Sequence, residues 1–173
     1  MNGAAPLVTY LGDPSLKHKL LMEIGKHEAA DQLVKGHYGE MNGQFTGCAI
    51  GCSLHSLNLL KGKIGKASLA DTNAHDRFPT ELGWPLWLAF YEDSIFENLP
   101  MELAKTWPRR VAEAVPVGVI VPDTILAKLQ AWSLIHERFG VVHVTDDAEL
   151  RRIVAQSGGL FERLGNGEDV PQA

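Results

Sequence analysis

Both cysteines of the chain and one of its histidines lie close together in the sequence. Cys48, Cys52 and His55 follow one another at spacings of four and three residues. A helix advances by about 100° per residue, so these three side chains would lie within an arc of roughly 60°, with Ile50 and Leu54 on the opposite side. We therefore predict a helix with one aliphatic face and one uncharged face of thiols and imidazole. Because the second face lacks Lys and Glu, we expect another helix or a ligand to cover it.

Three interpretations of this Cys/His face stay open. Free cysteines often behave as small buried hydrophobes, so the face can be a packing seam with His55 bonded to a carbonyl or carboxylate. It can also bind metal, because thiolates and imidazole are ligands for zinc or iron. In a thiol-dependent enzyme, Cys48 near the helix N-terminus would be the nucleophile and Cys52 the resolving thiol. His55, with Glu23 or His27, would then act as a base or proton relay.

The preceding segment offers further ligands and proton carriers. Residues 13–34 read as a helix that begins with an Asp-Pro cap and continues as an apolar stripe. Glu23, His27 and Asp31 recur every four residues beside this stripe. They either flank the stripe at the solvent boundary or face the Cys/His helix, since buried polar groups need partners.

In the second case a composite polar site forms between the two helices. His37 and Glu40, in the intervening glycine-rich segment, could join it. The candidate metal ligands are then His27, Glu23, Cys48, Cys52 and His55. The candidate catalytic residues are Cys48, Cys52 and His55.

The rest of the chain reads as helices joined by short connections, which predicts an all-α, bundle-like single domain over residues 1–173. Residues 1–12 and 165–173 are expected to be flexible termini. A short β ribbon is possible between the β-branched segments 116–121 and 141–145. The expected elements are a loop at 36–47, a Cys/His helix at 46–60, a long connection at 61–77, an aromatic helix within 79–99, a helix at 101–114 interrupted at Pro108, and helices starting at Asp123 and Asp146.

The aromatic helix carries a second group of titratable residues. Glu92, Asp93 and Glu97 would form a carboxylate cluster there, and the simpler interpretation is a solvated face. Four tryptophans are expected to anchor the core, although one or two can instead mark a dimer interface. A homo-oligomer is therefore a possible state of the chain.

The composition excludes some classes of partner. The formal net charge is −5 and the 16 lysines and arginines are scattered, which argues against nucleic acid. No run approaches the roughly 18 apolar residues of a membrane span, and the first residues do not form a secretory signal. Two closely spaced cysteines in such a chain do not suggest a disulfide framework. We expect a soluble, cytoplasmic protein with no membrane and no nucleic-acid partner.

The chain contains a G-C-A-x-G-C segment at 47–52, an E-L-G-x-P-x-W-L-A segment at 81–89, and the stretches 91–100 and 114–118. These segments resemble a group of small, uncharacterised bacterial and phage-encoded proteins. The resemblance covers roughly residues 25–135 and implies membership of that group, but no activity.

The Cys/His segment also resembles, more distantly, the AhpD-like thiol proteins of the carboxymuconolactone-decarboxylase type. These are all-α and carry C-x2-C-x3-H on a helix, with an upstream glutamate. Here the distance from the first cysteine to the histidine matches, but the second cysteine is displaced by one position. The displacement departs from the C-x-x-C geometry that lets two such sulfurs bond.

The sequence therefore favours a small helical binding or interaction protein. Its Cys/His face would be a packing seam or a pocket for a metal or small molecule. The alternative is a thiol-dependent enzyme that uses Cys48 with His55. The sequence indicates no particular cofactor.

Overall fold

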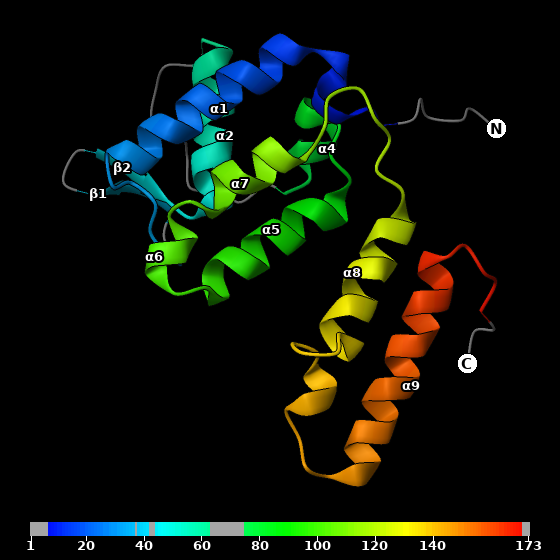
Figure 1. Cartoon of the computed structure of the whole chain (residues 1–173). Coiled ribbons are helices and arrows are strands. Elements are labelled where there is room, and N and C mark those ends of the chain that lie inside the picture. Colours follow the sequence, from blue (N-terminus) through cyan, green and yellow to red (C-terminus); the bar gives the residue numbers. More distant parts are fainter. Residues whose placement is uncertain (1–6, 37, 42–43, 63–74, 171–173) are drawn as a thin grey trace. The chain divides into compact units, whose positions relative to one another are not determined.

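The computed structural model describes residues 7–36, 38–41, 44–62 and 75–170. For residues 38–41 and 44 it describes the backbone but not the side chains. Within these ranges the chain is all-α, as predicted, and it also contains one short hairpin (Figure 1). The α-helices are α1 (Pro14–Ala29), α2 (Ala49–Leu60), α4 (Arg77–Leu82), α5 (Leu86–Asn98), α6 (Met101–Ala104), α7 (Trp107–Ala114), α8 (Asp123–Ile135) and α9 (Ala148–Gly165). Two 3-10 helices, η1 (Thr9–Gly12) and η2 (Val141–His143), and two strands, β1 (Tyr38–Met41) and β2 (Gln44–Gly47), complete the described elements.

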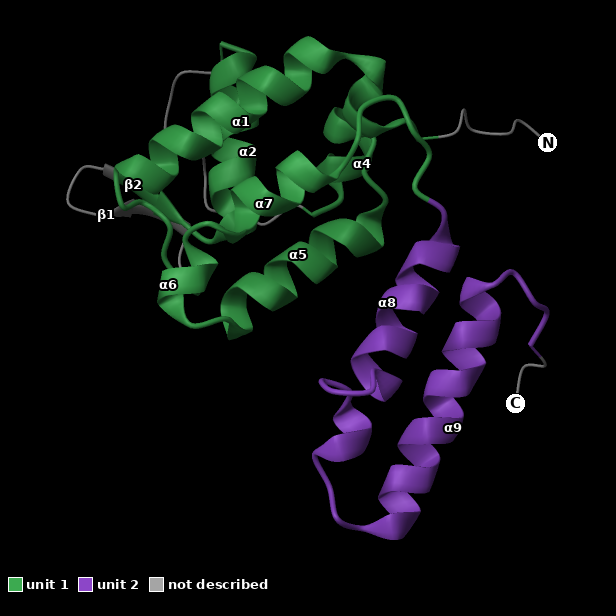
Figure 2. Ribbon diagram, viewed as in Figure 1, with its two compact units in different colours: residues 1–121 green, residues 122–173 purple. Residues whose placement is uncertain are grey.

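The chain divides into two compact units, residues 1–121 and residues 122–173 (Figure 2). Unit 1 contains η1 to α7, and unit 2 contains α8, η2 and α9. The amino-acid composition does not change near residue 121 in a way that would predict this division. The sequence predicted one domain over residues 1–173. That the two units fold together as one domain stays a prediction.

The first helix begins as its sequence predicts but ends earlier. The Asp13 carboxylate accepts a hydrogen bond from the Ser15 N–H at 2.8 Å, and Pro14 occupies the first turn. The helix ends at Ala29 rather than near Val34, because Asp31 adopts a left-handed backbone conformation with a φ of 56°. Asp31 therefore lies outside the helix.

The glycine-rich segment that was expected to be a loop contains the hairpin. β1 and β2 pair antiparallel, with Tyr38 opposite Gly47 and Met41 opposite Gln44. The sequence signal was the pair Asn42-Gly43, a dipeptide typical of two-residue hairpin connections. The ribbon expected between 116–121 and 141–145 is absent from these described residues, since Val141–His143 is a 3-10 helix.

Helix α2 packs against α1, α5 and α7, and in Figure 1 it runs behind α1 and α7. Nine of its residues are buried, namely Ala49, Ile50, Gly51, Cys52, Ser53, Leu54, Ser56, Leu57 and Asn58. Neither face of this helix is a solvated surface, in agreement with the prediction that its uncharged face is covered.

The segment before α1 is part of the core of unit 1. Thr9 and Tyr10 are fully buried. The Thr9 hydroxyl donates to the Pro116 carbonyl at 2.6 Å, and the Tyr10 hydroxyl donates to the Ala112 carbonyl at 2.5 Å. The Thr9 N–H also donates to the Val119 carbonyl at 2.9 Å. We call these hydrogen bonds of Thr9 and Tyr10 the clasp; they were not expected in a flexible terminus over residues 1–12. Residues 1–6 and 171–173 lie outside the described part.

Unit 2 is a helical hairpin in which α8 and α9 approach closely. Gly158 and Gly165 of α9 are buried, and a Cβ at these positions would lie 2.2 Å from an Ile135 carbon and 2.7 Å from a Lys128 carbon. Helix α9 starts one residue later than predicted, because Asp147 rather than Asp146 caps it. No helix in the described ranges is both long and apolar enough to cross a membrane.

Candidate functional site

The three residues of the Cys/His face lie on one helix but meet different partners. Cys48 contacts α5, Cys52 contacts backbone carbonyls, and His55 contacts α1 and β2. The predicted face therefore divides into three environments along the length of α2. Cys48, Cys52 and His55 do not form one compact group of donor atoms in the described structure.

Cys48 is held between the hairpin and the start of α2. The residue before it, Gly47, is bonded on both sides, because its N–H donates to Gln32 and its carbonyl accepts from Val34 at 2.9 and 3.0 Å. Cys48 is the N-cap residue of α2, with an extended ψ of −177°. Its carbonyl accepts the first helical hydrogen bond, from the Cys52 N–H at 2.9 Å. This arrangement fixes a fully buried thiol at the N-terminal end of the helix.

The Cys48 thiol faces two carboxylates of α5. Its Sγ lies 3.3 Å from the Asp93 Oδ1. Glu97 lies one turn further along α5, and one ligand atom from each of Cys48, Asp93 and Glu97 falls within 4.8 Å of the other two. Both Glu97 oxygens also accept from the Gly36 N–H at 3.1 Å. The three side chains thus form a mixed sulfur and oxygen donor group, which we call the Cys48 cluster.

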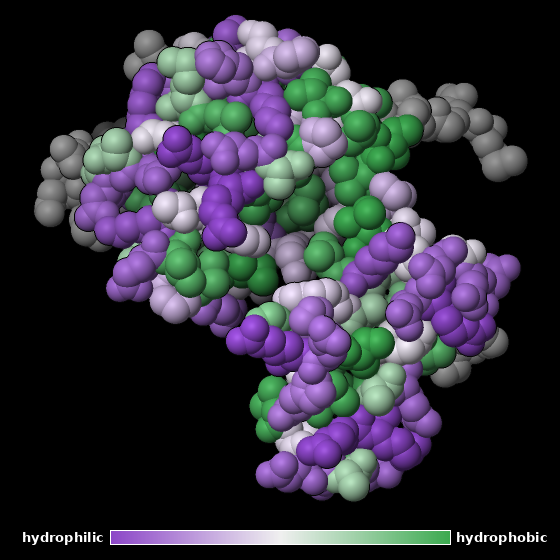
Figure 3. All heavy atoms as spheres, viewed as in Figure 1, coloured by the Kyte–Doolittle hydropathy of each residue, from purple (hydrophilic) through white to green (hydrophobic). Residues whose placement is uncertain are grey.

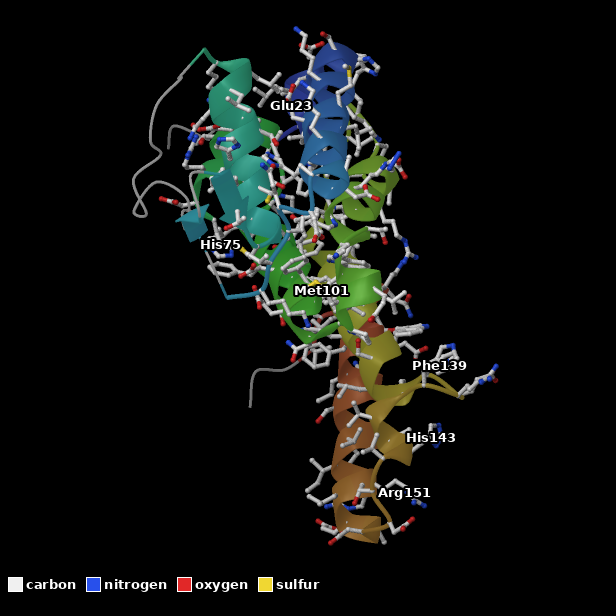
Figure 4. The ribbon with its side chains drawn as sticks, turned by 90° about the vertical axis from the view of Figure 1, so that its left-hand side faces the viewer. Glu23, His75, Met101, Phe139, His143 and Arg151 are labelled. Atoms are coloured by element: carbon white, nitrogen blue, oxygen red, sulfur yellow. The ribbon has the colours of Figure 1, made fainter. Side chains whose placement is uncertain are left out.

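His75 adds an imidazole to the edge of the Cys48 cluster. Its Nε2 lies 3.3 Å from the Asp93 Oδ2, and its ring stacks on Phe90 of α5 with centroids 4.4 Å apart. Figure 4 shows His75 beside the start of α2. Asp93 consequently contacts Cys48 through one oxygen and His75 through the other.

No lysine or arginine in the described ranges makes an ion pair with Asp93 or Glu97. Both residues are half-buried, and the thiol between them is fully buried. Two carboxylates and a thiol therefore lie close together, and the His75 imidazole contacts one of them, Asp93. Such a donor group favours a bound cation, because like charges in a partly buried site repel one another.

Cys52 lies in a different setting from Cys48. It is fully buried, and its Sγ lies 3.3 Å from the Gly47 carbonyl oxygen and 3.8 Å from that of Gln32. Burial, and secondarily the charge of Cys48, raise the pKa of the Cys52 thiol far above its ordinary value. Cys52 is therefore held as a neutral thiol, which is a poor ligand and a poor resolving nucleophile in this environment.

His55 pairs with His27 rather than with a cysteine. The His55 Nδ1 lies 3.3 Å from the His27 Nε2, and the His27 Nδ1 lies 2.6 Å from the Gln32 Oε1. Phe45 of β2 stacks on the His55 ring with centroids 3.9 Å apart and planes 7° apart. The expectation that His27 faces the Cys/His helix is thus met at His55. We call His27 and His55 the histidine pair.

The electrostatic surroundings of the histidine pair favour neutral rings. Burial lowers the pKa of both imidazoles, and repulsion from a positively charged His27 ring further lowers the pKa of His55. Gln32 and Glu23 act in the opposite direction on the pKa of His27. Glu23 itself bonds to Lys26 at 2.6 Å, and Figure 4 shows it between α1 and α2.

The remaining residues of the expected polar site lie elsewhere. Asp31 is exposed and pairs with Lys105. His37 lies outside the described residues, as does the side chain of Glu40. Among the described residues, the set Glu23, His27, Cys48, Cys52 and His55 is thus replaced by two groups: the Cys48 cluster and the histidine pair.

The carboxylates of α5 are not the solvated face that the sequence suggested. Glu92 is fully buried and its Oε2 has no hydrogen-bond partner. Burial, and secondarily the charge of Asp93, raise the pKa of Glu92 to about 8. Asp93 and Glu97 turn toward Cys48. The available signal was the spacing of Asp93 and Glu97, which puts two carboxylates on one side of an otherwise aromatic helix.

Comparison with protein-family models, with curated proteins and with solved structures finds no match for this chain. The resemblance based on the G-C-A-x-G-C and E-L-G-x-P-x-W-L-A segments accordingly stays a prediction. The function of the chain must therefore be argued from the side chains that its fold brings together.

Proposed function

We propose that this chain is a small helical metal-binding protein whose site is the Cys48 cluster. The observation that carries the proposal is the placement of the Cys48 sulfur and one oxygen each of Asp93 and Glu97 within 4.8 Å of one another. In a tetrahedral zinc site, bonds of about 2.0–2.3 Å put neighbouring ligand atoms roughly 3.3–3.8 Å apart. Small side-chain rotations would therefore bring the three donor atoms around one ion.

The donor chemistry favours a zinc-like transition metal. Carboxylates alone suit magnesium and calcium, whereas a thiolate selects softer ions, and a mixed set suits borderline ions such as zinc. A bound dication would also remove the repulsion between Asp93 and Glu97. It would hold Cys48 as thiolate, because metal binding deprotonates a coordinating thiol.

His75 has one of two roles in this proposal. It can supply the fourth ligand, since its Nε2 already lies beside Asp93. Alternatively it orients Asp93 by hydrogen bonding, as residues behind a metal ligand commonly do. Either role accounts for an imidazole that is half-buried on Phe90 and directed at the cluster.

Titration with Co²⁺ and Zn²⁺ after treatment with a chelator tests the proposal. Co²⁺ is spectroscopically visible, and coordination by a thiolate adds a sulfur-to-metal charge-transfer band in the near ultraviolet. We expect binding of one ion per chain with that band present. Cys48→Ala should abolish the band, and Glu97→Gln should weaken binding by more than the roughly 10–100-fold typical of losing a residue that only orients a ligand.

Matched controls distinguish the Cys48 cluster from the other polar groups on α2. Cys52→Ala removes the second thiol of the same helix, and His55→Gln removes an imidazole of the histidine pair. Both variants should keep the charge-transfer band. Loss of the band in Cys52→Ala or His55→Gln would instead support the ligand set first predicted from the sequence. Failure of the parent chain to bind either ion would contradict the proposal.

A further inference from the structure

Helix α9 carries an apolar stripe on its solvent side. Leu150, Ile153, Leu160 and Leu164 are 52%, 46%, 45% and 39% exposed. With Ser157 between them, these positions are separated by three, four, three and four residues. Figure 3 shows apolar side chains on the surface of unit 2 among charged ones. We call these five positions the α9 stripe.

The α9 stripe is separate from the face that packs within unit 2. The hairpin contact with α8 is made at Gly158 and Gly165, which are buried against Ile135 and Lys128. On a helical wheel the mean direction of the α9 stripe lies about 100° away from these glycines. A helix in a four-helix bundle contacts two neighbours in directions of this kind. Within unit 2, α9 contacts α8 and the short η2, and the four apolar residues of the α9 stripe stay exposed beside these contacts.

The spacing of the α9 stripe specifies what kind of surface fits it. Apolar residues at alternating intervals of three and four form the seam of a left-handed helix pair, in which each side chain enters a gap between residues of the facing helix. The partner must carry apolar residues at the same period. An identical helix meets this requirement, and the resulting interface would be symmetric about a two-fold axis.

The charges beside the α9 stripe favour an antiparallel pair. Glu149, Gln156 and Arg163 follow one edge of the stripe at intervals of seven. In an antiparallel pair with its two-fold axis near Gln156, Glu149 of each copy faces Arg163 of the other. In a parallel pair, Glu149 and Gln156 would instead face the apolar Val154 and Phe161. The opposed helix dipoles also favour the antiparallel orientation.

Glu149 and Arg163 form only exposed ion pairs within one chain. Glu149 pairs with Arg152 at 2.6 Å and Arg163 pairs with Glu168 at 2.8 Å. All four side chains are about half-exposed or more, and exposed ion pairs contribute little to stability. Replacing these ion pairs by ion pairs between two copies would therefore cost little free energy.

We propose that the α9 stripe is a self-association surface, on which α9 of a second copy of this chain binds in antiparallel orientation. Two hairpins joined in this way form a four-helix bundle from α8 and α9 of each copy. The stripe spans only about 21 Å from Leu150 to Leu164, so the dimer should depend on concentration. Ser157 near the centre of the seam limits its strength.

Sedimentation of the full chain over a concentration series tests the proposal. We expect a reversible monomer–dimer equilibrium that Leu160→Glu shifts toward monomer by at least about a hundredfold in Kd, since the two-fold axis puts the charge into the interface twice. Ala155→Glu, which adds the same charge on an exposed position outside the stripe, should leave Kd nearly unchanged. Circular dichroism checks that both variants keep their helices.

A charge exchange tests the antiparallel orientation. Arg163→Glu should weaken the dimer, and adding Glu149→Arg to the same chain should restore it. These residues are fourteen positions apart on one helix, roughly 21 Å, so restoration requires contact between copies. A chain that stays monomeric at high concentration, or a dimer that Leu160→Glu leaves intact, would overturn the proposal.

Discussion

The Nδ1 atom of His55 lies 3.3 Å from the Nε2 atom of His27, and the His27 Nδ1 lies 2.6 Å from the Gln32 Oε1. Two neutral rings can satisfy both contacts if each ring donates its Nδ1–H to the next group. The His55 Nδ1–H donates to His27, and the His27 Nδ1–H donates to Gln32. If both rings were protonated, the N–H at the His27 Nε2 would point at the N–H of the His55 Nδ1. The geometry therefore opposes charging both members of the histidine pair.

The histidine pair should make the chain less stable in mild acid. Burial lowers the pKa of both rings in the folded state, so below about pH 6.5 the unfolded chain binds protons that the folded chain excludes. The free energy of unfolding should therefore fall as the pH decreases from about 6.5 through the lowered pKa values. Denaturant titrations at several pH values measure this dependence. The variant His55→Gln should make the free energy of unfolding depend less steeply on pH. An unchanged dependence would contradict the role given to the histidine pair.

Glu92 should produce the opposite pH dependence. Its folded pKa of about 8 lies above the ordinary 4.5, so its contribution is fully present below pH 4.5 and is lost as the pH rises to about 8. Glu92→Leu removes a buried carboxyl whose Oε2 has no partner. We expect this variant to be more stable than the parent at pH 7.5, by on the order of 2 kcal/mol.

The comparison for Glu92 is the exposed Glu102 on α6. Glu102→Leu should leave the stability and its pH dependence nearly unchanged, because no burial penalty is relieved there. Both variants are measured by denaturant unfolding at pH 5 and pH 7.5. If Glu92→Leu destabilises the chain at pH 7.5, then the carboxyl makes a favourable interaction that outweighs its burial.

Two glycines should respond in opposite ways to alanine. Gly83 ends α4 with a φ of 63°, and a Cβ there would lie 1.9 Å from the Val8 carbonyl oxygen. Gly83→Ala should therefore destabilise the chain by roughly 2 kcal/mol or more. Gly25 lies inside α1, and no atom outside its own stretch of helix lies within 4 Å of an added Cβ, so Gly25→Ala should stabilise the chain by about 0.5–1 kcal/mol. Thermal unfolding compares the two variants in one experiment.

Both thiols should resist alkylation in the folded chain. Cys48 and Cys52 are fully buried, and burial also raises the pKa of Cys52. Iodoacetamide treatment followed by mass spectrometry should find both cysteines unmodified under native conditions and both modified in denaturant. Rapid native alkylation confined to Cys48 would speak for the thiol-dependent enzyme that the sequence left open.

Local sequence rules predicted much of the fold. The Asp13-Pro14 start of α1 was predicted from its capping residues. The helix predicted over 101–114 is divided into α6 and α7, with Pro108 in the first turn of α7 rather than at the break. Both features depend on residues a few positions apart, so the local sequence indicates them. The same rules correctly indicated that the uncharged face of α2 is covered. The hairpin was missed because its glycines were read as loop residues, although Asn42-Gly43 favours strand pairing.

The partners of the Cys/His face could not be predicted in the same way. A helical wheel gives the direction of a side chain but not the identity of the helix that it meets. Cys48 meets Asp93, which is 45 residues away, whereas His55 meets His27 on another side of the bundle. The wheel arc of roughly 60° therefore spans contacts with two different neighbours.

The clasp formed by Thr9 and Tyr10 sets an order of events during synthesis. These residues bond to carbonyls of Ala112, Pro116 and Val119, more than a hundred positions later. A growing chain emerges from its N-terminus, so the first residues of unit 1 must wait for the last ones before their buried groups are satisfied. The α8–α9 hairpin, by contrast, closes through neighbours in the sequence. Unit 1 can thus close only after Val119 has been made, and the hairpin of unit 2 only after α9 has followed it.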